Sequence, residues 1–129
     1  MARVYLDASA LYLHWDTPAA VVAPDGERAV ELLRSDGHQV TVLGATAATA
    51  AAWASRLPRA EQAAPEAPNR EPAWLIVGDR ARCRMRVAGL RTVLVGGGPA
   101  PNTGRGRCDL EAADLHGAVL AVIGGAAIA

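Results

Sequence analysis

Four short apolar segments of this chain have the composition of buried β-strands. They are rich in valine, leucine and isoleucine, and an acidic residue or a glycine marks the end of each. The segments are residues 3–6, 38–44, 73–77 and 91–95. Runs of this length and composition are typical of parallel strands that are buried on both faces. We therefore expect a parallel sheet.

Helical patterns separate these segments. From Glu27 onward, apolar residues recur at the spacing of an amphipathic helix of about three turns, and Gly37 stands where glycine favours the end of a helix. Further helices are expected at residues 44–56, up to Gly89 and at residues 110–123. Residues 8–16 predict a loop or a short helix. The alternation predicts an α/β fold built from right-handed β-α-β units.

The length and composition of the chain favour one compact unit. We expect a single domain over residues 1–129, with a proline-rich linker or loop at residues 58–72. The 13 basic residues, all arginine, balance 13 acidic residues, so no net charge attracts nucleic acid or an anionic membrane. The apolar C-terminal run from Gly117 falls short of the ~20 residues that span a bilayer.

The two cysteines, Cys83 and Cys108, lack the spacing of a metal site. The chain starts without a pattern typical of a signal peptide. We therefore expect free thiols and a cytoplasmic location, because disulfides are rare in reducing compartments.

Two acidic residues follow predicted strands. Asp7 comes directly after the first strand, and Asp79 follows the strand at residues 73–77 after one glycine. The carboxyl ends of parallel strands are where open α/β sheets bind ligands. If the two strands are neighbours, both acids face one crevice and can hold a divalent cation. The alternative is that each carboxylate only caps the helix or turn after its strand.

The order of these parts resembles the haloacid dehalogenase (HAD) superfamily of phosphohydrolases. Residues 4–11 resemble its first motif, residues 29–44 the elements leading to its second, and residues 74–79 with 88–95 its fourth motif and the strand that follows. Residues 108–116 are similar to the usual ending of the family. The resemblance implies a compact, cap-less, three-layer Rossmann-like domain. Its parallel sheet has about four to five strands and helices on both faces, with the first and third predicted strands as neighbours.

The resemblance also implies roles for particular residues. Asp7 takes the position of the nucleophile that accepts the phosphoryl group. Mg²⁺ is held by Asp7, the backbone carbonyl of Ser9 and Asp79, a set of oxygen ligands that suits this ion. Thr46, close to the second-motif position, is a candidate for binding phosphate. Arg80 is another candidate on its position alone, because it opens the predicted helix beside Asp79 and can either meet an anion or neutralise that acid.

Several positions depart from the pattern of the family. Ser9 stands where an acid protonates the leaving group, and Gly44 stands where a hydroxyl binds phosphate. The second acid of the fourth motif is missing. The third-motif cation has no clear counterpart; the candidates are Arg56, Arg59 and Arg70. We expect a degenerate HAD-like protein, a weak or inactive Mg²⁺-dependent phosphohydrolase relative that acts as a binding or regulatory domain.

Two alternatives stay open at this point. One is a functional HAD-type phosphatase that uses Asp7 as nucleophile. The other is a PIN-like metal-dependent nuclease, because residues 4–11 also resemble the opening strand of that family; its acid cluster would need Glu31 and either Asp109 or Asp114. For the favoured interpretation we expect a small phosphorylated ligand or a protein partner, no nucleic acid, no membrane, and a homodimer as a further option.

Overall fold

The computed structural model describes residues 3–15, 17–44, 46, 73–79, 90–96 and 110–128. Its elements are β1 (Arg3–Asp7), α1 (Ala8–Leu11), β2 (Tyr12–Leu13), β3 (Val21–Val22), α2 (Gly26–Ser35), β4 (Gln39–Leu43), β5 (Ala73–Val77), β6 (Leu90–Val95), β7 (Leu110–Ala112) and α4 (Leu115–Ile128). Five strands form one sheet in the order β4-β1-β5-β6-β7, and every pairing in it is parallel. The predicted α/β class and parallel sheet are confirmed. The arrangement is compatible with a Rossmann-like fold.

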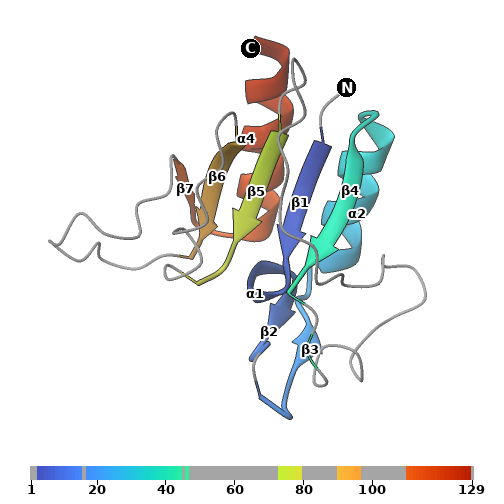
Figure 1. Ribbon diagram of the computed structural model, residues 1–129. Helices are drawn as coiled ribbons and strands as arrows, with labels where there is room; N and C mark the ends of the chain where they lie inside the picture. The colour runs from blue at the N-terminus through green and yellow to red at the C-terminus, as the bar shows by residue number, and fades with distance from the viewer. Residues whose placement is uncertain are drawn as a thin grey trace, which may run out of the picture.

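The predicted neighbours lie side by side. β1 pairs with β4 on one side and with β5 on the other, in a register that places Leu6 opposite Val42 and Ile76. Helices α2 and α4 lie next to each other on one face of the sheet (Figure 1). The helices expected at residues 44–56 and up to Gly89, and the linker at 58–72, lie outside the described residues.

Alternate side chains of the strands form two apolar layers. The larger layer joins one face of β1, β5 and β6 to buried residues of α2 and α4, with Leu6, Ile76 and Val93 at its centre. On the other face Tyr5, Leu75 and further apolar side chains are also buried. β5 is buried along its whole length. This burial of both faces explains why its sequence is a continuous apolar run.

Helix α2 ends as its sequence predicts. Gly37 adopts φ +85°, its N–H donates to the carbonyl of Arg34, and the N–H of His38 donates to the carbonyl of Leu33. This pair of hydrogen bonds is the Schellman motif, in which a left-handed residue satisfies the last carbonyls of a helix. The motif turns the chain directly into β4.

A small hairpin follows β1. The predicted loop or short helix at residues 8–16 is a single helical turn, α1, followed by strand β2, which pairs antiparallel with β3. The hairpin lies beyond the carboxyl ends of β1 and β4 (Figure 1). Two residues per strand are too few for a strand pattern to stand out in the sequence.

The C-terminal part differs from the prediction. The helix expected at residues 110–123 begins at Leu115 and continues to Ile128, while Leu110–Ala112 form the edge strand β7 beside β6. Asp114 precedes α4 and caps it, because its side chain accepts a hydrogen bond of 2.7 Å from the N–H of Gly117. No helix within the described residues is long and apolar enough to cross a membrane.

Candidate functional site

Asp7 lies at the carboxyl end of β1, as predicted, and is fully buried. It is the N-cap of α1: its Oδ2 accepts a hydrogen bond of 3.1 Å from the backbone N–H of Ser9. The Ser9 hydroxyl donates to the same carboxylate oxygen. The interpretation of Asp7 as a cap is therefore confirmed. Ser9, at the predicted acid/base position, therefore donates a hydrogen bond to Asp7, at the predicted nucleophile position.

Ser9 also joins β1 to β5. The backbone N–H of Gly78, directly after β5, donates a hydrogen bond of 2.9 Å to Ser9 Oγ. The Ser9 hydroxyl has one proton, and Ser9 uses it in the hydrogen bond to Asp7. The Ser9 oxygen is therefore the acceptor for the N–H of Gly78. We call this directional chain, from Gly78 N–H through Ser9 to Asp7, the Asp7–Ser9–Gly78 clasp.

The clasp requires a glycine at position 78. A Cβ built on Gly78 would lie 2.0 Å from the carbonyl oxygen of Ser9 and 2.9 Å from Cα of Ala10. Both contacts are with backbone atoms, which cannot rotate away. The Ser9 carbonyl, one of the three predicted Mg²⁺ ligands, therefore lies where a side chain on residue 78 would begin. Residue 78 directly precedes Asp79.

Asp79 lies two residues beyond the end of β5 and is partly exposed. Because Leu6 is opposite Ile76, the register places Asp7 level with Val77, on the neighbouring strand. The described residues contain no group of three or more histidine, cysteine, aspartate or glutamate side chains placed to hold a metal ion. The predicted ligand set has two acids and a backbone carbonyl.

Of the two predicted phosphate-binding residues, the structure describes Thr46. Thr46, three residues after β4, directs its hydroxyl to the carbonyl of Trp15 in the hairpin, at 3.4 Å. Gly44, the position at which the HAD resemblance predicts a hydroxyl, adopts φ +84°. Arg80 lies outside the described residues, as do the alternative cations Arg56, Arg59 and Arg70.

The structure does not gather the described acids that a PIN-like site needs. Glu31 is an exposed residue of α2, and Asp114 caps α4. Within the described part of the chain, neither of them forms a metal-binding group with Asp7 and Asp79. Asp109 lies outside that part.

One ionisable side chain of the core borders the site. Tyr12 directly follows α1, and its backbone N–H donates to the carbonyl of Ala8. The side chain is buried, and this burial raises the pKa of Tyr12 above its ordinary value of 10.0, because the charged phenolate is poorly solvated there.

Sequence reasoning did not find the clasp as a unit. The signals were present, because Asp7 followed by Ser9 is a pattern for a helix cap, and Gly78 precedes the second acid.

Comparison of the chain with protein-family models, with curated proteins and with solved structures gave no match.

Proposed function

We propose that this chain is a degenerate HAD-like domain of the cytoplasm that binds a small phosphorylated ligand or a protein partner and has little phosphatase activity. One observation carries the proposal: Asp7 is buried, and its Oδ2 accepts hydrogen bonds from both the N–H and the hydroxyl of Ser9. A carboxylate held in this way acts as a structural acceptor at the end of β1.

The same arrangement disfavours phosphoryl transfer. The two hydrogen bonds that Oδ2 of Asp7 accepts lower the nucleophilicity of this carboxylate. A serine hydroxyl cannot protonate a leaving group near neutral pH, and general acid catalysis typically contributes ~10²–10⁴-fold. Ser9 therefore favours binding over turnover.

The residues present fit Mg²⁺. Asp7, the Ser9 carbonyl and Asp79 are oxygen donors, and hydration water would complete the octahedral coordination that this ion requires. The Ser9 carbonyl oxygen takes the space that a Cβ on Gly78 would fill, and Gly78 directly precedes Asp79 in the chain. When bound, the ion would supply positive charge for a phosphate group.

The test of binding is calorimetric titration with Mg²⁺ and, separately, with inorganic phosphate in the presence of Mg²⁺. We expect Mg²⁺ binding that Asp79→Asn weakens at least ~10-fold, while Asp36→Asn, at the opposite end of the sheet, leaves it unchanged. Absence of Mg²⁺ binding up to ~10 mM would overturn the metal-binding part of the proposal.

The test of activity is a panel of phosphomonoesters with Mg²⁺. We expect at most trace hydrolysis, which Ser9→Asp raises and Asp7→Asn removes. The alternative, a functional phosphatase, would be correct if the protein of natural sequence hydrolyses a substrate faster than ~1 s⁻¹ and Asp7→Asn abolishes this activity.

A further inference from the structure

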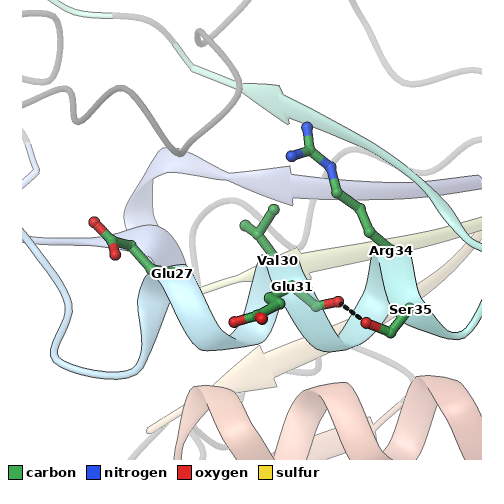
Figure 2. Close-up of a pocket in the computed structure, with 5 residues that line it drawn as sticks. All are labelled: Glu27, Val30, Glu31, Arg34 and Ser35. Carbon is green, nitrogen blue, oxygen red and sulfur yellow. Dashed lines mark hydrogen bonds between the residues drawn. The ribbon is translucent and has the colours of Figure 1, made fainter.

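The two helices that cover one face of the sheet, α2 and α4, differ in their outward surfaces. Helix α2 carries exposed charged side chains there, and Figure 2 shows Glu27, Glu31 and Arg34 beside a hollow of about 380 Å³. All the described residues that line this hollow belong to α2 itself. A charged outer face is typical of a helix in contact with water.

Helix α4 has no such charged face. Its sequence contains no aspartate, glutamate, lysine or arginine, and His116 is its one ionisable side chain. The side that packs on the sheet is formed by buried residues: Leu115, Ala118, Val119 and Val122. Leu120, on the other side, is 54% exposed. Since a helix that is apolar all round is normally buried, the outward face of α4 has the composition of a contact surface.

The edge of the sheet beside α4 extends this surface. β7 is the edge strand, and within the described residues it pairs with β6 alone. Ala112 packs against the core cluster that contains α4, and Leu110 lies on the same face of the strand because side chains alternate. Leu110 is 44% exposed. We call Leu110 together with the outward side of α4 around Leu120 the α4–β7 face.

The absence of charge identifies the partner that suits this face. An acidic or basic partner finds no ion pair on α4, whereas an uncharged apolar surface is complementary to a copy of itself. Two-fold symmetry brings the same patch of both copies together and so requires this self-complementarity. The formal net charge of the chain is zero, so two copies do not repel each other over long range.

We propose that the α4–β7 face is the contact between two copies of this chain in a symmetric dimer. A stable contact buries ~800 Å² on each partner. Helix α4 has 14 residues, about 21 Å at 1.5 Å per residue, and one side of it is available. The contact therefore needs both α4 and the edge strand with Leu110. The inference is independent of the proposed function because it uses no residue of the clasp.

The experiment is sedimentation velocity of the whole chain between ~1 and ~500 μM, which measures its mass in solution. We expect a monomer–dimer equilibrium with a Kd below ~100 μM. Leu120→Arg places a charge in the apolar contact of both copies and should raise this Kd at least ~10-fold. Leu110→Arg should raise it as well, and it decides the question if Leu120→Arg does not fold by circular dichroism.

The matched control is Leu13→Arg. Leu13 is 46% exposed, similar to the other two leucines, but it belongs to β2 of the hairpin and lies outside the α4–β7 face. This variant should keep the Kd within ~2-fold of the natural sequence. A dimer that Leu13→Arg weakens as much as Leu120→Arg, or that neither Leu120→Arg nor Leu110→Arg weakens, overturns the proposal.

A chain that stays monomeric up to ~500 μM also overturns the proposal. Sedimentation with phosphatidylcholine vesicles then tests a lipid surface as the other occupant of this face. Vesicle binding by the monomer that Leu120→Arg removes would assign the face to lipid in place of a second copy.

Discussion

The backbone N–H of Gly78 donates a hydrogen bond to Ser9 Oγ at 2.9 Å, across 69 residues of chain. This contact joins the end of β5 to the first turn after β1, where Ser9 in turn donates to buried Asp7. The carboxyl ends of the two central strands are therefore connected through one hydroxyl group. The contact has consequences for stability that can be measured.

Gly78→Ala should destabilise the protein by about 3 kcal/mol or more, because the new methyl group would overlap the Ser9 carbonyl and neither backbone can yield cheaply. Chemical denaturation measures the free energy of unfolding. Gly124→Ala is the control, because the added Cβ meets nothing within 4 Å beyond the adjacent residues and the backbone of its own helix. Alanine in a helix should stabilise by up to ~1 kcal/mol relative to glycine. Equal stability of the two variants would contradict the close contact at Gly78.

Ser9→Ala should cost ~1–3 kcal/mol, because buried Asp7 loses a donor and the N–H of Gly78 loses its acceptor. The control is Ser35→Ala on the exposed face of α2, which should change stability by no more than about 0.5 kcal/mol. A double-mutant cycle with Asp7→Ala should give a coupling energy of ~0.5–3 kcal/mol. Additive effects of the two substitutions would show that the side chains do not interact.

Tyr12 should make the protein sensitive to alkaline pH. Burial raises the pKa of Tyr12 in the folded state above the value of 10.0 expected when unfolded. The stability that this difference provides is fully present below pH 10.0 and is lost as the pH rises through the folded-state pKa, because the unfolded chain releases the proton first. The chain contains no lysine to titrate in the same range.

The measurement for Tyr12 is the free energy of unfolding at several pH values on either side of 10.0, for the natural sequence and for Tyr12→Phe. We expect the alkaline loss of stability to be smaller in Tyr12→Phe. Identical pH dependence in the two proteins would assign the loss to other groups.

Asp114→Ala should destabilise α4 by ~0.5–2 kcal/mol, because the N–H of Gly117 loses its 2.7 Å hydrogen bond to the capping carboxylate. Asp114→Asn keeps an acceptor oxygen and should retain most of the stability. Hydrogen exchange of the first turn of α4 locates the effect. If alanine and asparagine behave alike, the cap contributes nothing measurable.

The sequence by itself determined the α/β class, the central strands and the end of α2. Residues 73–77 are a continuous apolar run because β5 is buried on both faces, and Gly37 ends α2 because the left-handed conformation there favours glycine. These features depend on local composition and on backbone conformation. A pattern in the chain can therefore reveal them.

The tertiary structure alone decided how the candidate site is connected. Asp7 and Ser9 are local partners, but the bond between Ser9 and Gly78 depends on the parallel pairing of β1 with β5. Strand β7 was likewise missed because three residues with a helical pattern pair with β6 only once the sheet has formed. A sequence carries no direct record of such contacts, since their energy arises between segments that the fold brings together from distant positions.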